Sequence, residues 1–118
     1  MDLICLALTI FLEARGEPLA GQYAVGQVIL NRTVSEDYPD SVCEVVAQPH
    51  QFAPHRQVKG EPVAKGLAFL IAADLLINYT PNTEVLWFYN PRKASPGWAD
   101  RLQPVSRIGR HLFLRRKT

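Results

Sequence analysis

Residues 3–12 form a strongly apolar run, and no other segment constrains the fold as much. The spacing of its side chains predicts a helix over 2–15, with one face made of Leu3, Leu6, Ala7, Ile10 and Phe11. Other apolar side chains fill the remaining faces, and a helix that is apolar all round belongs in a protein interior. The run is too short to cross a bilayer, which needs roughly 20 residues. The chain must therefore build its fold around a central, buried helix.

A second helix is predicted over 20–32, and it carries Gly26 in its interior. Glycine costs about 1 kcal/mol relative to alanine inside a helix. We therefore expect a neighbouring helix to approach closely at Gly26.

Two more helices follow. Ser41 and Glu44 form a capping-box pattern, which predicts a short helix over 41–48. A long helix is predicted over 62–78, with Asp74 expected as a surface residue at the edge of its apolar stripe.

The rest of the chain predicts loops and a small β element. Residues 49–60 form a loop, residues 84–89 are rich in strand formers, and a polar loop spans 90–104. Residues 105–114 alternate in part and are expected to pair with 84–89. With 118 residues, the chain has the size of one domain, 1–118.

Charge is distributed unevenly along the chain. Residues 1–91 carry 5 Lys and Arg against 10 Asp and Glu, a sum of −5, whereas residues 92–118 carry 8 against 1, a sum of +7. The segment 92–118 is therefore a candidate for binding a polyanion. It lacks interleaved aromatic residues and a helix-turn-helix pattern, so nucleic acid is not the predicted partner.

Glu13 is the strongest candidate for acid–base chemistry. It closes an apolar helix, and burial of a carboxyl group raises its pKa. A carboxyl group that stays protonated near neutral pH can act as a general acid. Glu17, four residues on, is the candidate for orienting or tuning Glu13. The alternative interpretation is that Glu13 pairs with Arg15 or marks the solvent end of the helix.

Aromatic and amide side chains in the loops suggest carbohydrate binding, because sugar rings have apolar faces and hydroxyl rims. The candidate substrate-binding residues are Gln51, Phe52, Tyr89, Asn90 and Trp98. The alternative is that the aromatic residues anchor their loops in the core.

Metal and thiol chemistry find little support. Cys5 and Cys43 are too few for a disulfide framework, and Cys5 is interpreted as a small buried hydrophobe. His50 and His55 lie in one loop with His111 remote, and no HExxH or CxxC motif is present. We therefore predict no metal and no cofactor.

Several motifs resemble those of a known family. They are residues 12–18 (LEARGEP), 28–32 (VILNR), 51–52 (QF), 88–91 (FYNP) and 108–113 (IGRHLF). In this order, over nearly the whole chain, they resemble the catalytic domain of the spore cortex-lytic enzyme and cell wall hydrolase family.

The resemblance implies an α+β, mainly α, lysozyme-like fold with a small β element and a substrate groove. It implies cleavage of peptidoglycan glycan strands between N-acetylmuramic acid and N-acetylglucosamine, with Glu13 as the acid. The sequence shows no signal peptide and no wall-binding domain, and in this respect it resembles the bacteriophage, endolysin-type members of the family. Such a protein is expected to be made in the cytoplasm and to reach the cell wall after release or delivery. For a phage protein, this is the cytoplasm of the infected host. Anionic envelope polymers are then expected partners of 92–118.

Two mechanisms and two rival functions stay open. A lytic transglycosylase needs Glu13 alone, whereas a hydrolytic muramidase needs a second carboxylate such as Asp37, Asp40 or Glu61 across the groove. The rival functions are a non-catalytic wall-binding or virion structural module on the same scaffold, and a nucleic-acid-binding helical domain.

Overall fold

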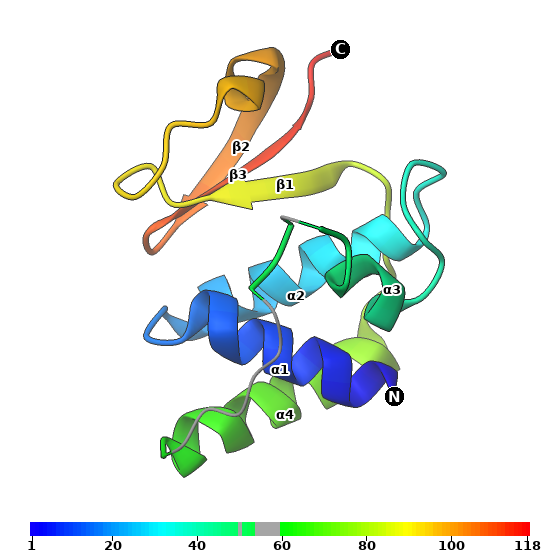
Figure 1. The fold of residues 1–118 in the computed structure, drawn as a ribbon, viewed down its shortest axis with the longest axis vertical. Helices are drawn as coiled ribbons and strands as arrows, with labels where there is room; N and C mark the ends of the chain where they lie inside the picture. The colour runs from blue at the N-terminus through cyan, green and yellow to red at the C-terminus, as the bar shows by residue number, and fades with distance from the viewer. Residues whose placement is uncertain (50, 54–59) are drawn as a thin grey trace.

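Helix α1 lies at the centre of the helical part in the computed structural model, which describes residues 1–49, 51–53 and 60–118 (Figure 1). The helices are α1 (Asp2–Ala14), α2 (Leu19–Thr33), α3 (Val42–Val46) and α4 (Pro62–Asn78). Helix α1 packs against the other three, which confirms the predicted central helix. Its burial is not complete, because Leu3 and Ile4 in the first turn are 39% and 48% exposed.

Gly26 permits the close packing of three helices. A side-chain carbon at this position would overlap Leu75 of α4 and come within 2.9 Å of Ile10 of α1. The predicted close approach is therefore confirmed. Asp74 of α4 is half-buried, and it accepts hydrogen bonds from Tyr23 of α2 and from Asn78 of its own helix.

Helix α3 begins with the predicted cap, in which the Ser41 hydroxyl accepts a hydrogen bond from the Glu44 backbone N–H at 3.2 Å. The helix ends at Val46, two residues earlier than predicted. It also corrects the interpretation of the cysteines, because Cys5 and Cys43 form a disulfide with their Cα atoms 5.3 Å apart. The short helix brings Cys43 against α1, a contact that the sequence spacing did not reveal.

A three-stranded antiparallel sheet lies over the helical part (Figure 1). Its strands are β1 (Val85–Tyr89), β2 (Leu102–Ile108) and β3 (His111–Arg116), in the order β1-β3-β2. The expected pairing of 105–114 with 84–89 is confirmed for β3, which pairs with β1, but the predicted loop 90–104 is wrong in part and 105–114 is not one continuous strand. The 3-10 helix η1 (Gly97–Arg101) and β2 occupy part of that loop, and a turn with Gly109 at φ 58° divides the expected strand into a hairpin.

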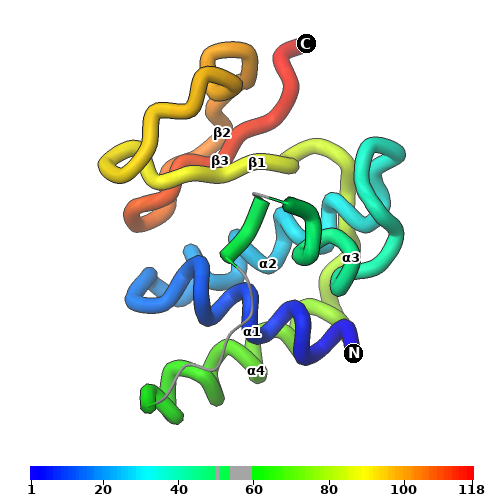
Figure 2. The backbone as a smooth tube through the Cα atoms, in the orientation of Figure 1, coloured from blue at the N-terminus to red at the C-terminus, as the bar shows by residue number. Residues whose placement is uncertain are grey.

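Two side chains at the end of α2 join the helices to the sheet. Asn31 donates from Nδ2 to the Val85 carbonyl at 2.9 Å, and Arg32 donates from Nε to the Leu86 carbonyl at 2.8 Å. Strand β1 lies at an edge of the sheet, and Figure 2 shows it running above α2. These bonds satisfy edge carbonyls that the sheet leaves free and fix the distance between sheet and helices.

The core extends from the helices into the sheet. Its largest fully buried side chains include Leu6, Ile10, Ile29, Ile71, Leu86 and Leu114. Within the described ranges, no helix has the length and apolar character needed to cross a membrane.

The disulfide generates a stability prediction. It closes a loop between residues 38 positions apart, for which the chain-entropy relation gives about 4 kcal/mol of stabilisation. We expect reduction to lower the free energy of unfolding by about 2–4 kcal/mol, measured by urea denaturation with and without a reductant.

The matched control is the double variant Cys5→Ala/Cys43→Ala, whose unfolding midpoint should not respond to the reductant. An unchanged midpoint in the parent, with two free thiols confirmed by thiol titration, would contradict the stabilising role.

Candidate active site

A groove of about 620 Å³ lies between the sheet and the helical part. Six of the seven residues predicted from the sequence line it: Glu13, Gln51, Phe52, Tyr89, Asn90 and Trp98. The other lining residues are Leu12, Arg32, Tyr38, Trp87, Phe88, Lys93 and His111. Glu17 is the predicted residue that does not line the groove.

Glu13 lies half-buried at the end of α1, where the helix meets the groove. Burial raises the pKa of Glu13, and the Ala53 backbone N–H, which donates to Oε2 at 3.2 Å, lowers it by less. The predicted direction is thus found. The alternative pairing with Arg15 is not, because Arg15 donates to Glu61 at 2.6 Å.

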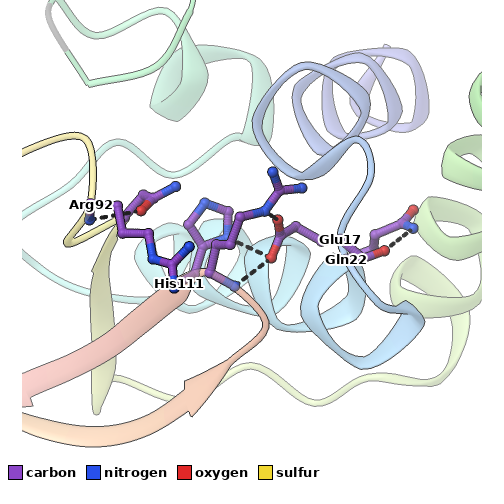
Figure 3. A network of polar contacts seen from close by, with 6 residues as sticks. Glu17, Gln22, Arg92 and His111 are labelled. Atoms are coloured by element: carbon purple, nitrogen blue, oxygen red, sulfur yellow. Dashed lines mark hydrogen bonds and ion pairs between the residues drawn. The ribbon is translucent and has the colours of Figure 1, made fainter.

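Glu17 binds the turn of the β2–β3 hairpin (Figure 3). Its carboxylate accepts from the Arg110 backbone N–H at 2.8 Å and from Arg110 Nε at 2.7 Å. Burial alone would raise the pKa of Glu17, but these hydrogen bonds and the nearby positive charge lower it overall. Glu17 therefore stays ionised, and it positions the sheet rather than approaching Glu13.

His111 connects this ion pair to the groove. Its Nδ1 lies 4.0 Å from Glu17 Oε1 and makes no hydrogen bond, and its ring packs edge-on against Phe88. Burial lowers the pKa of His111, with Arg110 and Lys93 acting in the same direction and Glu17 opposing them. The imidazole is accordingly neutral near pH 7.

Aromatic rings form two pairs along the groove. Tyr89 and Trp98 meet edge to face with centroids 5.7 Å apart, and Phe52 lies 6.2 Å from Phe88. Trp98 is 39% exposed, so it is not a loop anchor plugged into the core. Phe52 is half-buried and packs on the core, so it both anchors its loop and lines the groove.

The two predicted amides are also held by local contacts. Gln51 accepts a hydrogen bond from Arg32 Nη1 at 3.0 Å through its Oε1. Asn90 Oδ1 accepts from the Arg92 backbone N–H at 3.0 Å. Each amide keeps its N–H₂ donors for a ligand.

Sequence reasoning gave no role to Arg32, Lys93 or His111. Arg32 lies in the last turn of α2, where a positive charge commonly stabilises the negative end of the helix dipole, so its sequence context indicates no special role. His111 shares its strand face with Phe113, and this alternation was the one available signal that it points toward the helices.

The arrangement suits acid–base chemistry on an extended ligand with apolar faces. Within residues 1–49, 51–53 and 60–118, no three His, Cys, Asp or Glu side chains gather as metal ligands would. His50 and His55, which the sequence analysis considered, lie outside the described residues.

Sequence comparison identifies similar proteins. The sequence model of the family described as Cell Wall Hydrolase matches residues 16–114, a span that begins just after Glu13. The chain is 35% identical over 114 residues to the spore cortex-lytic enzyme of Oceanobacillus iheyensis and 34% identical over 114 residues to that of Bacillus subtilis. These matches cover 95% of this chain but 41% and 37% of the two relatives, so the chain spans about two fifths of their length.

Solved structures agree with this. The catalytic domain of the germination-specific lytic transglycosylase SleB from Bacillus anthracis matches with a TM-score of 0.77 and 30% identity, over 97% of this chain and 93% of that one. The catalytic domain of the Bacillus cereus SleB protein matches with a TM-score of 0.76 and 30% identity, over 97% and 89%. The predicted fold class, lysozyme-like α+β and mainly α, is confirmed.

The raised pKa of Glu13 predicts how stability depends on pH. The folded state holds this proton to a higher pH than the unfolded chain, so the contribution of Glu13 to stability falls as pH rises between the two pKa values. Glu13→Gln keeps an acceptor for Ala53 and carries no charge. We expect its free energy of unfolding, relative to the parent, to increase between about pH 4 and about pH 8 in urea denaturation.

Glu36→Gln is the matched control, because Glu36 is exposed and does not line the groove. The Glu13 assignment would be contradicted by a Glu13→Gln difference that is the same at both ends of the pH range.

Proposed function

This chain belongs to the cell wall hydrolase family, and we propose that it cleaves peptidoglycan glycan strands between N-acetylmuramic acid and N-acetylglucosamine. Glu13 is the proposed general acid and base. The similar SleB catalytic domain is named a lytic transglycosylase, and we infer the same activity for this chain.

One observation carries the proposal. Among the described residues that line the groove, Glu13 is the only one with a carboxyl group, and its pKa is raised by burial. A protonated carboxyl group in a long groove can donate a proton to a glycosidic oxygen. The aromatic pairs that line the groove supply flat apolar surfaces for sugar rings.

In the proposed reaction, Glu13 gives its proton to the glycosidic oxygen as the bond from that oxygen to C1 of the muramoyl residue breaks. The substrate's N-acetyl group stabilises the positive charge that develops at C1. Glu13, now a carboxylate, takes the proton of the muramoyl 6-hydroxyl, whose oxygen bonds to C1. The proton balance closes on Glu13, and the product is an anhydro sugar formed without water.

The positions of the other carboxylates favour this transglycosylase route over hydrolysis. Asp37 pairs with Arg116, and Glu61 pairs with Arg15. Neither of these groups lines the groove, nor does Asp40. A hydrolytic route needs a second carboxylate about 6.5–9.5 Å from the acid to activate water, or about 5–5.5 Å away to act as nucleophile.

Glu17 supports catalysis indirectly in this proposal. By binding Arg110 it holds the hairpin that bears His111, and His111 lines the groove with Glu13. The predicted support role is thus retained as a positioning role.

The setting of the activity stays a prediction. The relatives described above are bacterial proteins, so the phage, endolysin-type origin rests on the sequence resemblance alone. We retain as a proposal that the protein acts on the cell wall after release or delivery from the cytoplasm. The disulfide is consistent with an oxidising place of action.

The central prediction concerns Glu13→Gln. Removing a positioned general acid costs about 10²–10⁴-fold in rate, so turbidity loss of purified cell walls should slow by that factor. Glu36→Gln should keep the parental rate. A folded Glu13→Gln protein that lyses walls at the parental rate would overturn the assignment. A parent without activity would favour the non-catalytic wall-binding or virion module.

Mass spectrometry of the released fragments separates the two chemistries. Anhydro-muramoyl ends are expected from the route above. Reducing ends would mean that water is the acceptor and that a second carboxylate acts.

We also propose that the segment 92–118 binds anionic envelope polymers. Arg110 and Arg116 are neutralised by Glu17 and Asp37, but the other cations of the segment make no ion pair with a described carboxylate. Several of them, including Arg107 and Lys117, are exposed on or beside the sheet.

Binding of the inactive Glu13→Gln protein to teichoic-acid-bearing walls should therefore weaken as salt rises. The Debye length falls from about 10 Å at 0.1 M to about 3 Å at 1 M ionic strength. Adding Arg107→Gln and Lys117→Gln should reduce the salt dependence, measured by co-sedimentation. Binding that is insensitive to salt would refute the electrostatic role, and equal binding to nucleic acid in a gel shift would support the rival function.

A further inference from the structure

Arg32 is a buried cation in the groove without a carboxylate partner among the described residues. It lies in the last turn of α2, it is 4% exposed, and it lines the groove. Arginine is almost never fully buried unless it is paired. Asp37 pairs with Arg116 and Glu61 pairs with Arg15, so neither carboxylate neutralises Arg32.

The guanidinium is held rigidly by neutral groups. Nε donates to the Leu86 carbonyl at 2.8 Å, and Nη1 donates to Gln51 Oε1 at 3.0 Å. The Tyr38 and Phe52 rings lie 4.6 Å and 5.2 Å from its central carbon. These contacts fix the plane of the guanidinium, but they use two of its five N–H donors and supply no negative charge.

No described group in the groove compensates the charge of Arg32. Burial lowers the pKa of Arg32, yet a guanidinium remains protonated in proteins. The raised pKa of Glu13 and the lowered pKa of His111 favour the neutral form of both groups. Lys93 adds a second cation. A buried cation of this kind is stabilised when a ligand anion pairs with it.

Arg32 and Glu13 are bound to the same short segment. Gln51 accepts from Arg32, and Ala53 donates to Glu13. Both Arg32 and Glu13 also line the same groove, so one ligand in the groove can reach the cation and the acid. Planar guanidinium groups bind carboxylates with two parallel hydrogen bonds.

We propose that Arg32 forms an anion subsite that binds a carboxylate on the 3-O substituent of a muramoyl residue beside the scissile bond. The inference rests on the proposed function and deepens it, because it makes the groove selective for acidic glycans over neutral ones such as chitin. The carboxylate belongs either to a free lactyl group or to an attached peptide, and the two sources share this chemistry.

The first test changes the ligand and leaves Arg32 in place. Isothermal titration of the inactive Glu13→Gln protein would compare three tetrasaccharides: chitotetraose, a muramoyl glycan with free lactyl carboxylates, and its methyl ester. We expect the acid to bind about tenfold or more tightly than the ester, a ratio that corresponds to about 1.4 kcal/mol. A peptide-bearing muramoyl glycan, in native and amidated forms, shows whether the peptide carboxylate is the one bound.

The second test changes the protein. Arg32→Gln in the Glu13→Gln background should bind acid and ester equally. Because both ligands are compared on the same protein, this loss of preference is separate from any general weakening that follows the loss of the Arg32 bond to β1. Lys65→Gln, which removes a cation outside the groove, should keep the acid preference. Lys93→Gln reports how much of the preference the second groove cation provides.

The outcomes separate the two hypotheses. Equal affinities for acid and ester in the Glu13→Gln protein, for the bare and the peptide-bearing glycan alike, overturn the subsite, and so does an acid preference that survives Arg32→Gln. If Arg32→Gln does not fold, the ligand comparison alone decides. Failure of the proposed function looks different, because the parent would then leave cell walls intact, whatever the affinities for acid and ester.

Discussion

The contact between Glu17 and the β2–β3 turn determines where the sheet lies over the helices. Arg110 binds the carboxylate through both its backbone N–H and its Nε. Gly109 makes the approach possible, since a side chain there would overlap the Glu17 carboxylate and come within 2.8 Å of Pro18. A positive φ of 58° at Gly109 adds a second reason for glycine. The groove exists because this contact and the Asn31 and Arg32 bonds to β1 hold the sheet at a fixed distance from α1.

Two glutamates four residues apart thereby acquire opposite properties. Glu13 ends a buried helix and meets one backbone N–H, so burial dominates and its pKa rises. Glu17 lies beyond the helix end and meets two donors of one arginine, so its pKa falls. One environment suits a group that must exchange a proton, and the other suits a group that must remain charged.

Local patterns predicted the helices well because their determinants are local. Apolar spacing located α1, α2 and α4 to within one residue at each end, and the Ser41 cap located α3. The β2–β3 hairpin was not predicted because β2 is exposed along nearly its whole length, so no buried face marks it as a separate strand. The disulfide and the Glu17–Arg110 pair join residues 38 and 93 positions apart, and no local pattern encodes such contacts. Glu13 and the aromatic residues that line the groove could be predicted as candidates, because each carries its signal in its own neighbourhood. The environment of Arg32, in contrast, exists only after α2, β1 and the 51–53 segment have come together.

The groove thus combines a carboxyl group with a raised pKa and a permanently charged guanidinium that has no counter-ion among the described residues. The carboxyl group keeps its raised pKa only if the guanidinium does not contact it. A guanidinium in direct contact with Glu13 would favour the carboxylate and lower its pKa. Gln51 and the rings of Tyr38 and Phe52 surround Arg32 instead, so its charge is held by neutral groups on the sides where they contact it. The same segment 51–53 therefore keeps the cation in place at one end and contacts the acid at the other, which lets one small groove hold a positive charge and a proton donor together.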